Sequence, residues 1–219
     1  MDEKTYLDSL EHSVTKQAHR QTGSRDFIDF VLTHVRGRCL EIGCGDGMWT
    51  KEICSRCDTL VSMDLSAGRL SRAKASAGAA GAKFIRADAR HLPFKGNSFE
   101  TVCAIEVIEH LPQRAFHRHL LAEISRVLIP SGTLVISTPN KPFFRVYCAL
   151  TGEKHPTHFS ELNYFQFKAV LRQYFPEVRL YGRFGWLLPW CRFLPVRKFH
   201  GFLSRFTPLC KGLTGVCRK

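Results

Sequence analysis

The stretch that decides the fold is Cys39–Thr50, CLEIGCGDGMWT. An apolar segment, Cys39 to Ile42, leads into three alternating glycines at positions 43, 45 and 47. Glycines directly after a buried strand let the backbone turn tightly and approach a nucleotide closely. Two carboxylates, Glu41 and Asp46, sit among these glycines. The stretch therefore indicates a nucleotide-like ligand, and the acids restrict which one.

Phosphate is a poor partner for this turn. No Lys or Arg lies between Cys39 and Thr50, whereas a P-loop requires a Lys for its phosphates. A dinucleotide fingerprint also fails, because the third glycine comes one residue early and Met48 takes its place. Carboxylates beside a pyrophosphate would repel it. They suit a cationic ligand such as S-adenosylmethionine, which carries an ammonium and a sulfonium but no phosphate.

Segments with strand and helix patterns alternate on both sides of the turn. Residues 4–33 are predicted to form one or two helices, with an apolar stripe at helical spacing. Further helices are expected over 49–57, 67–78, 113–128 and 160–175, the last capped by Ser160, and a turn is expected at 130–132. Strands are expected over 39–42, 59–64, 82–87, 98–105 and 133–137, with others at 178–181 and 213–217.

This alternation predicts an α/β fold. We expect a Rossmann-like, doubly wound, seven-stranded sheet that is mostly parallel, with helices on both faces and an antiparallel last strand. Ligands of such sheets bind beyond the carboxyl ends of the strands. The residues that follow each strand are therefore the candidates for the site.

The 219 residues suit one domain with small additions. We divide the chain into an N-terminal helical cap (1–36), a binding core (37–182) and a C-terminal segment (183–219) that completes the sheet. The start of the sequence has no apolar stretch typical of a signal peptide, and no apolar run is long enough to span a bilayer. We therefore expect a cytoplasmic protein.

Nine cysteines are present, an odd number with irregular spacings. The only C-x-x-C pair is Cys54 and Cys57, and no second pair with similar spacing accompanies it. We expect the cysteines to be structural, as small apolar side chains, and we expect no metal site.

Five motifs appear in order along the chain: EIGCGDG (41–47), an acid at Asp64, ADARHLPF (87–94), EVIEHL (106–111) and RVLIPSGTLVISTPN (126–140). Together they resemble the class I S-adenosylmethionine-dependent methyltransferases, over about residues 25–182. The last two motifs, with HPTHFSEL (155–162), are similar to the type 11 subgroup that includes ubiquinone-biosynthesis O-methyltransferases.

The resemblance implies the cofactor S-adenosylmethionine and a set of residues that would contact it. Asp64 would accept hydrogen bonds from both ribose hydroxyls, and Asp88 with Ala89 would lie at the adenine. The implied set comprises Glu41, Gly43, Cys44, Gly45, Asp46, Gly47, Asp64, Leu65, Asp88, Ala89, Glu106 and Val107.

Methyl transfer is an in-line displacement, and an oxygen acceptor usually also needs a base to remove its proton. Three histidines are candidates for this catalytic role: His110, His155 and His158. His158 departs from the pattern H-x-x-E-F-[ST] that is frequent in the subgroup, because it stands where a Glu is usual. Each histidine could instead be a packing or hydrogen-bonding residue, and the sequence does not choose among them.

The formal net charge is +13, and the chain from Val178 to Lys219 contributes nine Lys and Arg with no acid. Aromatic residues are interleaved with this charge. Ordinary packing over the sheet and peripheral membrane contact through 183–206, at the inner face of a membrane, both explain such a segment. Nucleic acid is disfavoured, because the segment is more apolar than a phosphate-binding groove needs to be.

The combined expectation is an S-adenosylmethionine-dependent methyltransferase of a small, hydrophobic acceptor, most simply an O-methyltransferase. The pocket walls would come from the N-terminal helices and from a loop over residues 141–159. The alternatives left open are a methyltransferase of RNA or protein, and a non-catalytic binding protein on the same fold.

Overall fold

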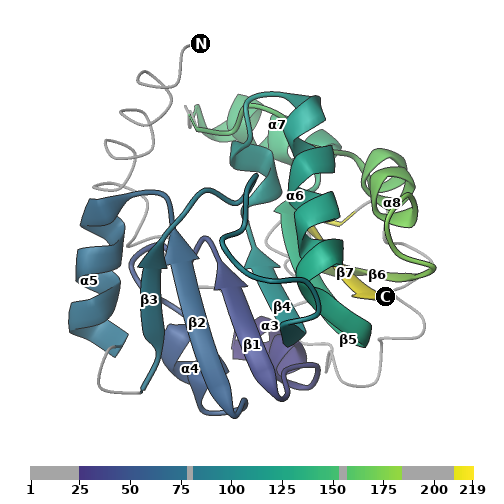
Figure 1. The fold of residues 1–219 in the computed structure, drawn as a ribbon. Coiled ribbons are helices and arrows are strands. Elements are labelled where there is room, and N and C mark those ends of the chain that lie inside the picture. Colours follow the sequence, from purple (N-terminus) through teal and green to yellow (C-terminus); the bar gives the residue numbers. More distant parts are fainter. Residues whose placement is uncertain (1–24, 78–80, 153–156, 184–209) are drawn as a thin grey trace.

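A seven-stranded sheet forms the centre of the molecule (Figure 1). The computed structural model describes residues 25–77, 81–152, 157–183 and 210–219. Its spatial strand order is β3-β2-β1-β4-β5-β7-β6. The strands are β1 (Arg38–Ile42), β2 (Thr59–Asp64), β3 (Lys83–Arg86), β4 (Phe99–Ile105), β5 (Leu128–Pro139), β6 (Glu177–Arg183) and β7 (Gly212–Arg218).

The first five strands in this order run parallel, and β7 lies antiparallel between β5 and β6. The predicted fold class is therefore confirmed, including the antiparallel last strand. The order reverses at β1, from which the chain moves outward first to β2 and β3 and later to β4 and β5. Such a switch point is where doubly wound sheets bind their ligands.

Helices cover both faces of the sheet (Figure 1). α6 and α8 pack with one apolar cluster, and α3 and α4 pack with a second cluster on the opposite face. The helices are α3 (Arg25–Leu32), α4 (Thr50–Cys54), α5 (Ala67–Ala77), α6 (Arg114–Val127), α7 (Lys141–Thr151) and α8 (Tyr164–Arg172), with a 3₁₀ turn η2 (Ile108–His110).

Neighbouring residues of one strand pack into different apolar clusters, one on each face of the sheet. In β1, Leu40 packs with the α6 side and Cys39 with the α3 side, and Val102 and Cys103 divide in the same way in β4. Successive side chains of a strand point to opposite faces of a sheet. Because both faces are covered, most residues of the central strands are buried, rather than every second one.

The predicted turn at 130–132 is wrong, because these residues lie inside β5. The strand begins at Leu128, which pairs with Phe99, and its register against β4 shifts before Thr133 pairs with Thr101. The irregularity accommodates the Pro-Ser-Gly sequence, with Ser131 at a φ of 66°. The backbone is irregular at residues 130–132, as the turn residues predict. Pairing with β4 on both sides of them nevertheless keeps them within one strand.

The loop expected over 141–159 is also wrong in its first part, which forms α7. Proline is tolerated in the first turn of a helix, where its missing N–H has no partner to lose, and Pro142 lies there. Gly152, at a φ of 68°, ends the helix in the left-handed conformation.

α8 begins at Tyr164, four residues after the predicted start at residue 160. Asn163 accepts a hydrogen bond from the backbone N–H of Gln166, whose side chain accepts one from the Asn163 N–H. This reciprocal capping box replaces the expected Ser160 cap. The Ser160 hydroxyl instead donates to the Leu111 carbonyl.

No helix among the described residues has the length and apolar character needed to cross a membrane. The predicted helical residues 4–24 and the aromatic, basic residues 184–206 lie outside the described residues. Of the C-terminal segment, β7 is described, and it is an inner strand of the sheet rather than an appendage.

Candidate functional site

The glycine turn connects β1 to α4 in a conformation that side chains resist. Gly43, Gly45 and Gly47 have φ values of 69°, 56° and 83°, in the left-handed region. A Cβ on Gly43 would lie 2.6 Å from Cγ2 of Val107. The N–H groups of Gly43 and Cys44 both donate to the Met63 carbonyl, at 2.8 and 3.0 Å. These bonds tie the turn to the end of β2.

The two acids of the turn face away from its ligand side. Glu41 is buried and accepts hydrogen bonds from the hydroxyls of Thr50 (2.8 Å) and Ser62 (2.7 Å). Burial raises the pKa of this carboxyl. Asp46 lies on the outer side, where it pairs with Nε of Arg72 at 2.9 Å. Glu41 therefore stabilises the turn through buried hydrogen bonds, and Asp46 links the turn to α5 through its ion pair with Arg72.

Asp64, the last residue of β2, is 8% exposed and receives two backbone hydrogen bonds. Its Oδ2 accepts from the N–H of Gly45 and its Oδ1 from that of Ser66, each at 2.9 Å. A carboxylate offers about four acceptor positions, so each oxygen can accept another hydrogen bond. The Ser66 hydroxyl accepts from the N–H of Arg69 and so caps α5, which leaves Asp64 to the ligand side.

A pocket lies beyond the carboxyl ends of β1, β2 and β4, with a volume of about 600 Å³ that includes its open mouth. Seven of the predicted cofactor residues and His110 line it, whereas Glu41, Cys44, Gly45, Asp46 and Gly47 do not. The lining comprises Ile42, Gly43, Met63, Asp64, Leu65, Arg69, Ala87, Asp88, Ala89, Glu106, Val107, His110 and Leu111.

Most acids of the pocket already have cationic or backbone partners. Asp88 forms a two-pronged ion pair with Arg90, which lowers the pKa of its carboxyl against the opposing effect of burial. Its Oδ1 also accepts from the N–H of Arg90 at 2.8 Å. Asp88 therefore shapes the loop after β3.

Glu106 follows β4 and is held from two other strands. Its Oε1 accepts from the Ser137 hydroxyl at 2.7 Å and pairs with the guanidinium of Arg183, the last residue of β6. That guanidinium lies 4.4 Å from the centre of the Phe27 ring. Glu106 has a φ of 55°, which is rare for a residue with a side chain. Sequence reasoning missed Arg183, because only the pairing of β6 through β7 brings it here.

Arg69 is the second cation that sequence reasoning missed. It lines the pocket from the first turn of α5, and its Nη1 lies 3.8 Å from the position of a Cβ on Gly45. Its Nε is buried and has no hydrogen-bond partner among the described residues. The only signal in the sequence is its place one helical turn after the acid that ends β2.

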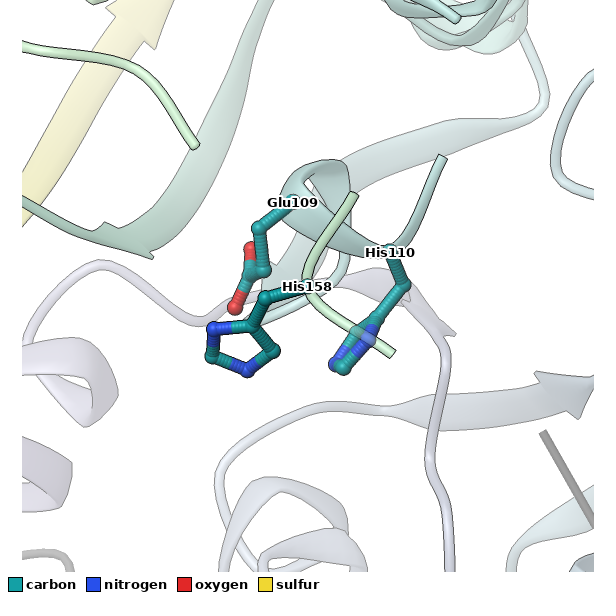
Figure 2. Close-up of side chains that lie close together, drawn as sticks. All are labelled: Glu109, His110 and His158. Atoms are coloured by element: carbon teal, nitrogen blue, oxygen red, sulfur yellow. The ribbon is translucent and has the colours of Figure 1, made fainter. Parts of the chain in front are cut away.

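Two of the candidate histidines meet beside the pocket, together with Glu109 (Figure 2). Nδ1 of His110 lies 2.9 Å from the Thr157 carbonyl oxygen, which can only accept, so the proton sits on Nδ1. Burial lowers the pKa of His110. The His158 ring is edge-on to His110, with centroids 5.1 Å apart, and is stacked on Phe144. His155 lies outside the described residues.

Glu109 is fully buried at the centre of η2. Burial and the neighbouring Glu106 carboxylate raise its pKa well above the usual range. Its backbone carbonyl accepts from the N–H groups of Phe159 and Ser160, at 3.0 and 3.2 Å. These two bonds hold the segment that carries His158 against η2.

Comparison with known proteins agrees with this geometry. The sequence model of the family described as "Methyltransferase domain" matches residues 40–136, from β1 into β5. The carboxyl ends of β1, β2 and β4 and most of the pocket lining fall within this range. The match covers less than half of the 219-residue chain.

Curated proteins that resemble this chain have names that specify different compounds. A 27-O-demethylrifamycin SV methyltransferase of Amycolatopsis mediterranei is 30% identical over 133 residues, which are 58% of this chain and 46% of that one. A ubiquinone biosynthesis O-methyltransferase of Azorhizobium caulinodans is 27% identical over 120 residues, 54% of this chain and 46% of that one. The chain spans about half the length of these relatives.

Solved structures extend the likeness of fold beyond residues 40–136 to nearly the whole chain. The N-methyltransferase NodS from Bradyrhizobium japonicum WM9, solved in complex with S-adenosyl-L-homocysteine, superposes with a TM-score of 0.72. The alignment covers 98% of each chain at 16% identity. At that identity the likeness establishes the fold.

Proposed function

We propose that this protein transfers a methyl group from S-adenosylmethionine to a hydroxyl oxygen of a small, hydrophobic acceptor. The observation that carries the proposal is the pocket at the switch point of the sheet, where the glycine turn, Asp64 and His110 meet. The match of residues 40–136 to the methyltransferase model and the methyltransferases among the similar proteins support it.

The residues that line the pocket fit S-adenosylmethionine. Asp64 has acceptor positions left on both carboxylate oxygens, as two ribose hydroxyls require. Ala87 and Ala89 have small side chains that leave room for a flat base beside the loop after β3. The missing side chain of Gly43 keeps open the space in front of Val107.

The charges of the pocket fit the amino-acid end of the same cofactor. We assign the ammonium to Glu106, whose Oε1 is engaged by Ser137 and Arg183 and whose Oε2 can receive the ligand. We assign the carboxylate to Arg69, a half-buried residue beside the glycine turn whose Nε is buried and has no hydrogen-bond partner among the described residues. Charge-assisted hydrogen bonds of this kind are about twice as strong as neutral ones.

When bound, S-adenosylmethionine supplies a methyl group on a sulfonium, which the acceptor oxygen takes while the electron pair of the broken C–S bond stays on sulfur. The residues of this chain bind, orient and exclude water. His110 holds its proton at Nδ1 against the Thr157 carbonyl, so Nε2 carries a lone pair. His110 lines the pocket, and the lone pair on its Nε2 can accept a proton or bind a cation.

The test is release of S-adenosylhomocysteine from the full chain over a panel of catechols, quinols, hydroxylated fatty acids and bulk tRNA. We expect release with a hydroxylated small molecule, and none with tRNA. The matched inactive control is Asp64→Asn. Release with tRNA alone, falling steeply with salt, would instead indicate an RNA methyltransferase. Failure to bind S-adenosylmethionine at millimolar concentration would indicate a non-catalytic protein.

A further inference from the structure

A fully buried carboxyl group lies beside the pocket. Glu109 is 0% exposed, and neither of its carboxylate oxygens has a hydrogen-bond partner among the described residues. The guanidinium of Arg183, whose charge also acts on Glu109, forms its ion pair with Glu106. Ionising a buried carboxyl group costs several kcal/mol, and a cation bound beside Glu109 would offset that cost.

Two imidazoles converge on the same space as this carboxylate (Figure 2). One ligand atom from each of Glu109, His110 and His158 can be chosen so that all three lie within 4.8 Å of one another. The side chains come from η2 and from the segment after α7, which the backbone bonds to the Glu109 carbonyl hold in place.

The hydrogen bond of His110 is the kind that metal-binding histidines make. Its Nδ1–H donates to a backbone carbonyl, which fixes the tautomer and leaves Nε2 as the ligand atom. Packing also holds the His158 ring, through its stacking on Phe144 with centroids 4.8 Å apart. Both rings are therefore oriented before any ligand binds.

We propose that Glu109, His110 and His158 form a binding site for one divalent transition-metal ion. Two imidazole nitrogens and one carboxylate favour Zn²⁺, Co²⁺ or Mn²⁺ over Mg²⁺ and Ca²⁺, which take oxygen ligands. The sequence predicts no metal site, because no second pair of ligands with similar spacing accompanies Cys54 and Cys57. His110 and His158 are 48 residues apart in the chain. The fold makes them neighbours.

Three protein ligands leave coordination positions open, as in catalytic rather than structural metal sites. His110 also lines the pocket, so these positions face the space for the acceptor. A hydroxyl bound to the ion would lose its proton to water more readily, which would ready the oxygen for methyl transfer. This consequence rests on the proposed function, whereas the metal site itself does not.

Metal binding is tested on the full, tag-free chain after treatment with a chelator. Loss of the electron paramagnetic resonance signal of free Mn²⁺ counts bound ions, and Co²⁺ absorption reports the ligand types. We expect one Mn²⁺ per chain and a Co²⁺ spectrum without the intense sulfur charge-transfer bands of thiolate ligation. Glu109→Gln and His158→Gln should each weaken binding by at least about tenfold, given that even outer-shell changes cost 10- to 100-fold.

His119→Gln is the matched control, because His119 is exposed on α6 and belongs to no such cluster. It should bind Mn²⁺ as the unaltered chain does. The proposal is overturned if the chain binds no ion, or if the Glu109→Gln and His158→Gln variants bind as the control does. A proton shared between Glu109 and His158 would then account for the buried carboxylate.

Calorimetry with S-adenosylhomocysteine separates this proposal from the proposed function. The Glu109→Gln and His158→Gln variants should keep cofactor binding, which also shows that they fold. Cofactor binding without metal binding in the unaltered chain would overturn the metal site alone. Metal binding without cofactor binding would overturn the methyltransferase proposal alone.

Discussion

At the scale of single residues, Asp64 joins the turn to the ligand space. Its two oxygens hold the N–H groups of Gly45 and Ser66, and their remaining acceptor positions face the pocket. The same side chain therefore shapes the turn and, on our proposal, recognises the ribose. Glu41 and Asp46 help only to shape the turn, since the side chain of one bonds to Thr50 and that of the other pairs with Arg72, and neither lines the pocket.

Replacing Asp64 by Asn should weaken the binding of S-adenosylhomocysteine by at least about tenfold. The amide nitrogen cannot accept a hydrogen bond, so a buried hydroxyl or N–H would lose its partner at a cost of about 1–3 kcal/mol. Calorimetry measures the affinity, and Asp58→Asn, at an exposed acid before β2, is the control. Equal affinities for the two variants would refute the assignment of Asp64 to the ribose.

Replacing Arg69 by Met should weaken S-adenosylhomocysteine binding about 10- to 100-fold, because a charge-assisted hydrogen bond contributes about 1.5–3 kcal/mol. The binding of 5′-methylthioadenosine, which lacks the amino-acid group, should not change. Calorimetry with the two ligands isolates the contact, since packing effects of the substitution would affect both. A parallel loss for both ligands would show that Arg69 does not bind the carboxylate.

At the scale of elements, the segment before α8 is held from two sides. The Glu109 carbonyl accepts its backbone N–H groups, and Nε2 of His117, on α6, lies 2.8 Å from the Ser160 hydroxyl. Because that hydroxyl donates to the Leu111 carbonyl, the His117 ring is the donor in this bond. α6, η2 and the segment with His158 thus form one unit beside the pocket.

His117 should make the stability of this unit depend on pH. Burial and the positive charge of Arg114 lower the pKa of His117 from 6.5 to about 4. Between these values the unfolded chain binds more protons than the folded one, so stability falls as pH falls from about 6.5 to about 4. The loss approaches about 3 kcal/mol, at 1.36 kcal/mol per pKa unit.

Urea denaturation at several pH values between 7 and 4 measures this contribution. His117→Gln keeps a donor for Ser160 but does not titrate, so its stability should fall less steeply with acid than that of the unaltered chain. His119→Gln, at an exposed position, should follow the unaltered chain. If all three curves run parallel, His117 titrates alike in the folded and unfolded states.

At the scale of the whole molecule, the C-terminus is structural. β7 lies between β5 and β6 and pairs with both along its whole length. Leu213 and Cys217 are fully buried in the main apolar cluster. Through β7, the chain also brings Arg183 to Glu106. β7 therefore contributes to the pocket indirectly, because it positions β6 and so places Arg183 beside Glu106.

A chain that ends at residue 211 should not fold cooperatively. Without β7, the inner strand β5 would expose its hydrogen-bonding edge, β6 would lose its place in the sheet, and apolar side chains would face water. Circular dichroism during heating, with the soluble yield, measures the effect. A chain lacking only Lys219 is the control and should melt cooperatively. Comparable melting of both chains would show that β7 is dispensable.

The sequence by itself determined the fold class, the order of the strands along the chain and the glycine turn. These follow from local causes: apolar periodicity, the need for left-handed backbone at three positions, and acids or small residues directly after strands. Position after a strand was enough to find Asp64, Asp88, Glu106 and His110, because parallel strands end at one edge. The prediction failed locally where a neighbour decided, as β4 did for residues 130–132.

Only the tertiary structure decided which way the side chains of the site face and what they meet. Glu41 and Asp46 carry the right charge in the right motif, but packing turns one into the core and the other to Arg72. Arg183 reaches Glu106, and His158 reaches Glu109, across 77 and 49 residues of chain. Such contacts depend on strand pairing and helix packing between distant segments, and no local sequence pattern predicts them.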